Sequence, residues 1–331
     1  MTTLKPADHY PSMTDPQHRP RYTGIPTFFR APMTQDLTEA DIGLIGVPFD
    51  GGVTNRTGTR HGPREVRNQS SLLRPFNPAT GAAPFQTARV RDLGDCWIER
   101  PYELSGALEE IEAFYRRVVQ AGVVTVTVGG DHSIAWPILR AVASERPVGM
   151  IHIDAHGDTG DDYMGSRFHH GAPFRRAMDD GLLDPKRVIQ IGLRGTSNTP
   201  GGMWAYSEEA GMRVMSMDEL HDRGWRYAVE EARRVAGEGP VYLSYDIDSL
   251  DPVYAPGTGT PEAGGLTTIE AQRILRGLMG LDIVGADLVE VSPPFDVGSI
   301  TSFNAASILY EILCITAEAF RLRKASSNQG R

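Results

Sequence analysis

Cysteine is scarce in this sequence. Only Cys96 and Cys314 occur among its 331 residues. Two thiols so far apart in the chain form neither a disulfide framework nor a cysteine-type zinc site, and this pattern is typical of proteins in a reducing compartment. We therefore expect the protein in the cytoplasm.

Concentrated positive charge and long hydrophobic runs are also absent. The formal net charge is −9, and lysine and arginine do not gather into a basic cluster. A nucleic-acid-binding protein needs such a basic surface to displace counterions from phosphates. The N-terminal residues 1–20 are polar and contain no apolar stretch of the kind found in signal peptides or membrane spans. The sequence therefore predicts neither a nucleic-acid partner nor a membrane.

From about residue 40 the chain repeats a short apolar run, a glycine-rich or acidic turn and an amphipathic segment. The apolar runs show continuous rather than alternating hydrophobicity, as expected of strands that are covered on both faces. Helical spacing of apolar residues recurs over 104–118 and 306–313. This alternation predicts an α/β fold with a mainly parallel sheet. The expected strands are 42–47, 123–128, 148–153, 188–193, 214–217, 241–245 and 283–291.

The domain organisation follows from the absence of internal boundaries. Between residues 40 and 322 we find no linker, no low-complexity tract and no fixed-period repeat. The sequence predicts a partly irregular N-terminal arm over 1–35, a single domain over 36–323 and a flexible tail over 324–331.

Three of the apolar runs end in motifs rich in histidine and aspartate. In an open α/β sheet the ligand crevice lies beyond the carboxyl ends of the strands. Side chains alternate along a strand, so residues two positions apart can face the same region. Spacing therefore permits the motif residues to converge. The six candidates are His132, Asp154, His156, Asp158, Asp246 and Asp248.

These residue types indicate metal chemistry. Two imidazoles and four carboxylates are too many ligands for one tetrahedral zinc ion, but they fit two five- or six-coordinate ions such as Mn²⁺, with Co²⁺ or Ni²⁺ as alternatives. Two divalent ions would also cancel the charge of about −4 on the aspartates. A metal pair lowers the pKa of a bridging water and yields hydroxide at neutral pH, so the sequence predicts a hydrolytic enzyme.

Two neighbouring residues have competing interpretations. Asp131 is either a helix cap or a residue that orients His132. His152 lies inside an apolar run, and for it we favour a buried, hydrogen-bonded role over metal ligation.

The motifs resemble those of the ureohydrolases, the family that includes arginase, agmatinase and the guanidino-acid hydrolases. The resemblance covers nearly the whole chain and implies a three-layer α/β/α fold, a binuclear manganese centre and hydrolysis of a guanidinium group to urea and an amine. It also implies a homotrimer or homohexamer. It rests on the segments 129–133, 152–158 and 244–252, and it extends to 46–50, 62–64, 255–262 and 289–294.

The resemblance assigns roles to individual residues. It implies that Asp154 and Asp246 are shared by two ions, one of which is completed by His132 and Asp158 and the other by His156 and Asp248. Glu290 matches the family glutamate that accepts paired N–H bonds from the guanidinium. His170, rather than His169, matches the histidine proposed to pass a proton to the departing amine. The predicted catalytic residues are His170, Glu290 and Asp248.

Four further segments most resemble the guanidinopropionase and guanidinobutyrase branch, namely 28–30, 54–56, 60–67 and 173–177. We therefore expect 3-guanidinopropionate or 4-guanidinobutyrate as the substrate. Arg74 and Arg194 are candidates for binding its carboxylate, but for each of them we favour a surface or interface position. Gly160 and Ala172 depart from the pattern of this branch, because each stands where the branch commonly has a polar side chain. The resemblance puts both positions in loops at the pocket. A smaller, more apolar pocket would admit an N-alkylated guanidine or a biguanide such as metformin, with nickel as an alternative metal. Agmatine is the other alternative substrate.

Two hypotheses of another class remain open. A non-catalytic partner subunit of a hetero-oligomeric ureohydrolase would be expected to lose metal ligands, whereas all six are present here. A single-zinc enzyme of the histone-deacetylase type has a related architecture, but it would not use Asp158 and Asp248 as ligands.

Overall fold

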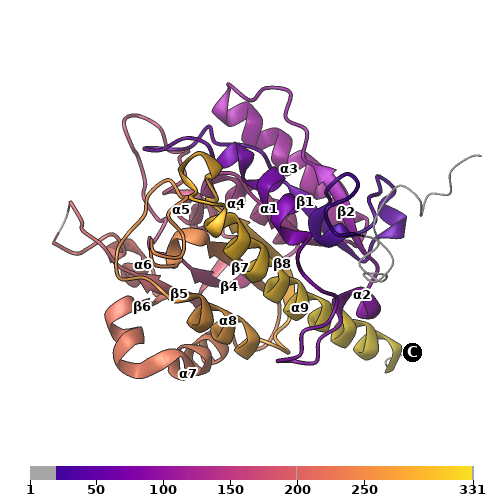
Figure 1. Ribbon diagram of the computed structural model, residues 1–331. Helices are drawn as coiled ribbons and strands as arrows, with labels where there is room; N and C mark the ends of the chain where they lie inside the picture. Colours follow the sequence, from indigo (N-terminus) through magenta and orange to yellow (C-terminus); the bar gives the residue numbers. More distant parts are fainter. Residues whose placement is uncertain (1–19, 199, 330–331) are drawn as a thin grey trace, which may run out of the picture.

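The computed structural model describes residues 20–198 and 200–329 (Figure 1). Its centre is an eight-stranded sheet in the order β2-β1-β3-β8-β7-β4-β5-β6, and every neighbouring pair is parallel. The strands are β1 Ile42–Gly46, β2 Val90–Asp95, β3 Val124–Val128, β4 Val148–Ile153, β5 Leu183–Leu193, β6 Arg213–Ser216, β7 Val241–Asp246 and β8 Ile283–Val289.

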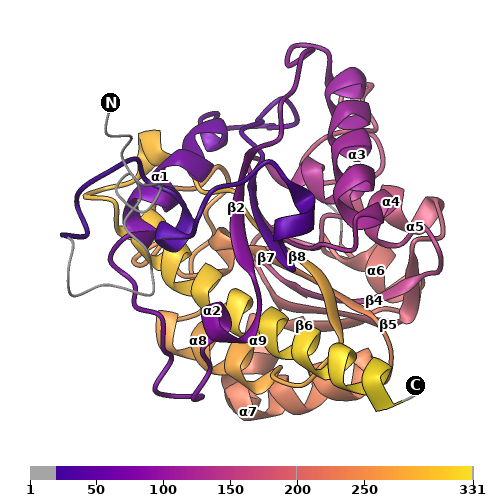
Figure 2. The ribbon, with the colours of Figure 1, turned by 90° about the vertical axis from the view of Figure 1, so that its right-hand side faces the viewer.

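Helices cover both faces of this sheet, so that the molecule has three layers (Figure 2). One layer holds α3, α4, α5 and α6, and the other holds α1, α2, α7, α8 and α9. The described helices are α1 Gly62–Ser70, α2 Pro84–Thr87, α3 Leu104–Gln120, α4 Ala135–Val142, α5 Pro173–Asp179, α6 Ala205–Glu209, α7 Met217–Ala236, α8 Thr268–Gly277 and α9 Ile300–Gln329.

Most strands contribute to two hydrophobic cores because their side chains alternate between the faces. In β7, Leu243 and Tyr245 pack with α7, α8 and α9, whereas Tyr242 packs with α3, α4 and α5. All six residues of β7 and all six of β4 are buried. This explains the continuous hydrophobicity of the predicted strands and confirms the predicted three-layer α/β/α fold.

The sequence analysis missed one strand, β2. It pairs with β1 at the edge of the sheet and forms a single bridge to Met33 on its other side, and its six residues include Arg91, Asp92 and Asp95. An edge strand with three charged residues lacks the long apolar run by which the others were predicted.

The structure describes part of each predicted end of the domain. Within the predicted arm, Phe28 and Phe29 are fully buried, and the backbone N–H of Phe28 donates to Asp92 at 2.8 Å. Residues 1–19 lie outside the described residues. Within the predicted tail, α9 continues to Gln329, so residues 324–329 are helical.

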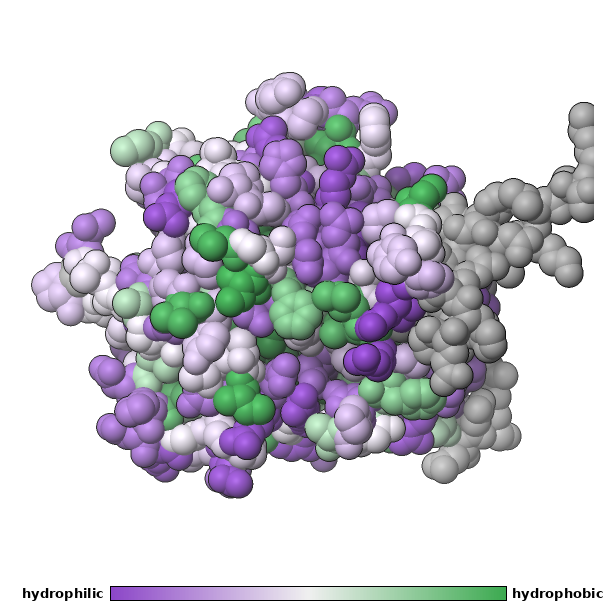
Figure 3. Space-filling view, in the orientation of Figure 1, coloured by the Kyte–Doolittle hydropathy of each residue, from purple (hydrophilic) through white to green (hydrophobic). Residues whose placement is uncertain are grey.

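Helix α9 is long and apolar enough to cross a membrane, but 78% of its most apolar stretch is buried inside the protein. It is therefore a core helix. On the face that carries α8 and α9, hydrophobic residues are scattered between hydrophilic ones (Figure 3).

A buried ion pair attaches β2 to α1. The Arg67 guanidinium donates to both carboxylate oxygens of Asp92, at 2.9 and 3.1 Å, and lies 4.1 Å from the centre of the Phe28 ring. Asp92 is fully buried, so removal of the arginine would leave its carboxylate without a cation.

We predict that Arg67→Met lowers the free energy of unfolding by about 3 kcal/mol, because it leaves a buried charge unpaired. Urea unfolding measures this loss. The control is Arg64→Met, which changes an exposed arginine of the same helix and should alter stability by no more than about 0.5 kcal/mol. Equal effects of the two substitutions would contradict the prediction.

Candidate metal centre

Four neighbouring strands, β3, β8, β7 and β4, end at the same edge of the sheet because all of them are parallel. The candidate residues follow these ends directly, so strands far apart in sequence deliver them to one place. After β3 comes His132, after β8 Glu290, at the end of β7 Asp246 and Asp248, and after β4 Asp154, His156 and Asp158.

The first group surrounds the imidazole of His132. Its Nδ1 lies 2.9 Å from an oxygen of Asp158 and 3.3 Å from oxygens of Asp154 and Asp246. This nitrogen is buried and makes no hydrogen bond with any described residue. A buried nitrogen that faces three carboxylate oxygens without bonding to them fits a cation site.

The second group surrounds His156. Its Nδ1 lies 3.1 Å from Asp248 and 3.5 Å from Asp154. Asp154 thus directs one oxygen toward His156 and the other toward His132. The His/Asp cluster could hold a metal ion, and Asp154 is placed to be shared by two.

Local hydrogen bonds explain why the strand ends fold in this way. The backbone N–H of His156 donates to Asp154 at 2.6 Å, and that of Asp248 donates to Asp246 at 2.8 Å. A carboxylate that binds the N–H two residues later fixes a tight turn. Asp158 and Glu290 adopt left-handed backbone conformations, with φ of 50° and 65°, as is found for strained residues at functional sites.

The electrostatics of the cluster favour bound positive charge. Burial, together with the neighbouring Asp248 and Asp154 carboxylates, raises the pKa of Asp246 well above its ordinary range. Burial also raises the pKa of Asp248. Because these carboxylates resist ionisation without a cation, the donor set fits divalent metal ions.

Asp131 is a helix cap, which was one of the two interpretations of the sequence. It accepts the backbone N–H of Ser133 at 2.9 Å, and its second oxygen accepts the N–H of Gly52 at 2.7 Å. It therefore anchors the segment 50–58 beside the site. Gly130 permits this arrangement, since a Cβ there would lie 1.6 Å from the backbone oxygen of Phe49.

Glu290 and His170 lie against each other beside the cluster. One oxygen of Glu290 accepts the backbone N–H of His132 at 2.8 Å and lies 3.0 Å from Nδ1 of His170. The other oxygen, Oε2, is buried and has no hydrogen-bond partner among the described residues. Burial of His170 disfavours its charged form, but the Glu290 carboxylate outweighs this and raises the pKa of His170 to about 9. Its Nε2 contacts the hydroxyl of Thr54 at 2.7 Å.

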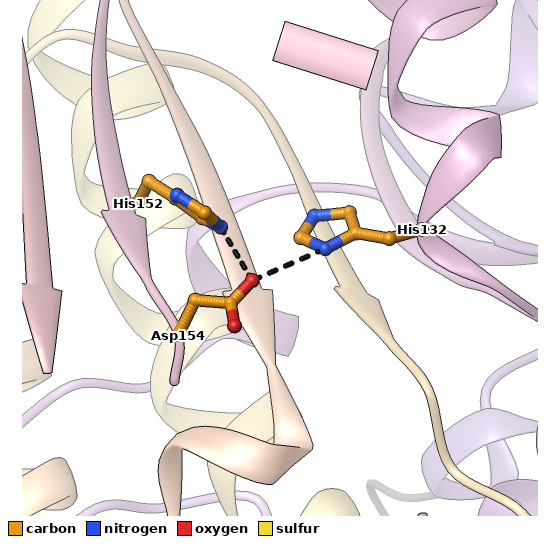
Figure 4. A group of neighbouring side chains, drawn as sticks. All are labelled: His132, His152 and Asp154. Carbon is orange, nitrogen blue, oxygen red and sulfur yellow. Dashed lines mark hydrogen bonds and ion pairs between the residues drawn. The ribbon is translucent and has the colours of Figure 1, made fainter. Parts of the chain in front are cut away.

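The two other histidines of this region, His152 and His169, differ in their hydrogen bonds. His152 is fully buried, with its Nε2 at 2.6 Å from Asp154 and its Nδ1 at 2.9 Å from the Gln190 amide, which confirms the predicted hydrogen-bonded role (Figure 4). His169 packs beside Gly160 and Gly171, and neither of its ring nitrogens has a hydrogen-bond partner among the described residues.

The departure at Gly160 does not open space in the pocket. A Cβ at this position would lie 2.9 Å from the oxygen of Gly171 and 3.2 Å from Cε1 of His169. The His169 ring already occupies the place of a side chain at 160.

Neither arginine proposed for the substrate carboxylate suits that role. Arg194 is 7% exposed and donates to backbone oxygens, including those of Asp248 at 2.7 Å and Glu262 at 2.8 Å. It therefore ties two loops of the site together. Arg74 is exposed and follows α1, which begins at the site edge of the sheet and runs away from it.

Comparison with known proteins agrees with this geometry. A family model described as the Arginase family matches residues 40–314. The chain belongs to the arginase family. This result confirms the resemblance drawn from the motifs.

Three relatives illustrate the similarity of this arginase-family chain to characterised proteins. It is 52% identical to guanidinopropionase from Pseudomonas aeruginosa over 95% of this chain and 98% of the relative. It is 47% identical to guanidinobutyrase from the same organism, over 89% and 93%. The solved structure of proclavaminate amidino hydrolase from Streptomyces clavuligerus is 39% identical, with a TM-score of 0.87 over 91% of this chain and all of that one.

The sequence analysis missed the polar residues that support the histidines of this arginase-family site. Ser244, Asp287 and Gln190 lie inside strands and are fully buried. The only signal for them was a polar residue within an otherwise apolar run. Such a residue indicates a hydrogen-bonded partner, but it does not identify the neighbouring strand that provides it.

Proposed function

We propose that this protein hydrolyses the guanidinium group of a short guanidino acid, such as 3-guanidinopropionate or 4-guanidinobutyrate, to urea and an amino acid. The observation that carries the proposal is the unpartnered oxygen of Glu290 beside two His/Asp groups that share Asp154. The similarity to guanidinopropionase and guanidinobutyrase over nearly the full chain supports this substrate class within the ureohydrolases.

Two divalent ions would be held by the clustered donors. His132 and Asp158 would complete one site, His156 and Asp248 the other, and Asp154 and Asp246 would serve both. Oxygen-rich ligands with one imidazole for each ion favour Mn²⁺, with Co²⁺ or Ni²⁺ as alternatives. Such a pair lowers the pKa of water enough to give a nucleophile at neutral pH.

Glu290 would bind and orient the substrate. A guanidinium is planar and cationic, and a carboxylate accepts its N–H groups through strong, directional hydrogen bonds. Oε2 of Glu290 is free for such a bond, whereas Oε1 is held by the N–H of His132. The bound guanidinium would therefore lie directly beside the metal ligands, where its central carbon can be attacked.

His170 would hold the proton that the departing amine requires. Its raised pKa keeps the imidazole protonated near neutral pH, and Glu290 fixes the orientation of the ring. The other ring nitrogen of His170, Nε2, contacts the hydroxyl of Thr54, which lies on the segment 50–58 that Asp131 anchors.

The remaining expectations belong to the same proposal. We infer a cytoplasmic homotrimer or homohexamer that needs no nucleic acid and no membrane. The convergence of all six ligands favours a catalytic chain over a non-catalytic partner subunit of a hetero-oligomer. Agmatine and an N-alkylated guanidine or biguanide such as metformin are the alternative substrates.

A substrate panel tests the proposed function. Urea release is measured with 3-guanidinopropionate, 4-guanidinobutyrate, agmatine, arginine, dimethylguanidine and metformin, each with Mn²⁺, Co²⁺ and Ni²⁺. Because Glu290 would take the guanidino group in each case, differences in kcat/KM report how the rest of the substrate fits. We expect a guanidino acid to exceed the other compounds by about tenfold or more. A preference for agmatine or a methylated compound would overturn the proposal.

Replacing the Glu290 carboxylate tests its role. Glu290→Gln keeps the shape of the side chain but removes its charge, and we expect kcat/KM to fall by about 100-fold because a charge-assisted bond is lost. The bound metal, measured by elemental analysis, should stay unchanged. The control is Glu230→Gln, at an exposed position of α7. A loss no larger than that of the control would exclude Glu290 from guanidinium binding.

A further inference from the structure

A row of polar residues crosses the buried sheet just below the candidate metal ligands. Thr127 of β3 is in register with Asp287 of β8, Asp287 with Ser244 of β7, Ser244 with His152 of β4, and His152 with Gln190 of β5. All five residues are essentially without solvent exposure. Polar groups buried in a sheet remain there only when they are hydrogen-bonded, so the bonds of this row need an explanation.

The bonds lead from the row to the first imidazole of the cluster. The hydroxyl of Ser244 donates to Asp287 at 2.6 Å, and the hydroxyl of Tyr242 donates to its other oxygen, also at 2.6 Å. Nε2 of His132 lies 2.8 Å from the same Ser244 hydroxyl.

The number of hydrogens that each group carries decides which atom donates in the bonds between Asp287, Ser244 and His132. Ser244 donates its one hydrogen to the Asp287 carboxyl group. Ser244 must then accept from His132, so the imidazole carries a hydrogen on Nε2. In the neutral imidazole this leaves the lone pair on Nδ1, the nitrogen that faces Asp154, Asp158 and Asp246.

In the described part of the chain, the Asp287 carboxyl group bonds only the hydroxyls of Ser244 and Tyr242. No lysine or arginine there forms an ion pair with it, although a buried carboxylate without a cation is costly. Tyr115, by comparison, bonds Thr127 at 2.7 Å at the other end of the row, without reaching a site residue. The rings of His132 and His152 are also fixed by Phe174 of α5, at 5.2 and 4.5 Å between ring centres.

We propose that Asp287 is a positioning residue, which acts through Ser244 to hold His132 in the tautomer that binds a metal ion. The inference rests on the metal pair of the proposed function. Asp287, in the centre of the sheet, would thereby affect the affinity of the ion beside His132. It would not contact the substrate. Loss of such a supporting partner typically weakens metal binding 10- to 100-fold.

The test compares metal affinity in full-length variants. Metal-stripped protein is titrated with Mn²⁺, and free Mn²⁺ is measured by electron paramagnetic resonance to give the stoichiometry and both dissociation constants. Asp287→Asn removes the charge of the acceptor, and Ser244→Ala removes the hydroxyl that links it to His132. The control is Thr127→Val, which removes a buried hydroxyl from the same row but leaves the chain to His132 intact. Thermal unfolding of each metal-free variant reports purely structural damage.

We expect the wild type and Thr127→Val to bind two ions with similar dissociation constants. In Asp287→Asn and Ser244→Ala one ion should bind about 10- to 100-fold more weakly, whereas the other should change by less than about threefold. If Asp287→Asn does not fold, the smaller change Ser244→Ala decides alone.

Two results would overturn the inference, and they can be distinguished. If the wild type binds two ions, and Asp287→Asn and Ser244→Ala bind both ions as tightly as the wild type does, Asp287 has only a structural role and the proposed function stands. If the wild type binds fewer than two ions, the proposed metal pair fails, and this inference fails with it.

Discussion

The mutual repulsion of four neighbouring aspartates, three of them buried, is the constraint on which the site depends. Asp154, Asp158, Asp246 and Asp248 lie within 3.5 Å of two histidines, in an interior that disfavours ionised carboxylates. Backbone N–H groups and histidines offset part of this cost. Divalent ions would offset the rest, which links metal binding to the stability of the same strand ends.

The parallel sheet makes this concentration of charge possible. Four adjacent parallel strands point their carboxyl ends toward one edge, and helices on both faces exclude water from it. Below the ligands, the polar row orients the imidazoles of His132 and His152. Beside them, Arg194 binds backbone oxygens on two loops, so it also positions the backbone that carries Asp248. The candidate ligands thus lie at the strand ends or in the segments directly after them, where buried hydrogen bonds hold them.

Much of this arrangement could be predicted from the sequence. Apolar runs gave seven of the eight strands, and the motifs after them gave the residues that converge, because parallel strands must end at a common edge. The polar row could not be predicted, since the pairing of Asp287 with Ser244 depends on register between strands about 40 residues apart in sequence. The surroundings of Gly160 and Arg194 could not be predicted for a similar reason, because their neighbours come from other segments of the chain.

The central claim is that this cluster holds two metal ions, and anomalous diffraction from crystals of the Mn²⁺-loaded protein tests it most directly. We expect two anomalous peaks about 3.5–4 Å apart, one beside His132 and one beside His156, with Asp154 between them. A single peak, or peaks away from these histidines, would contradict the account.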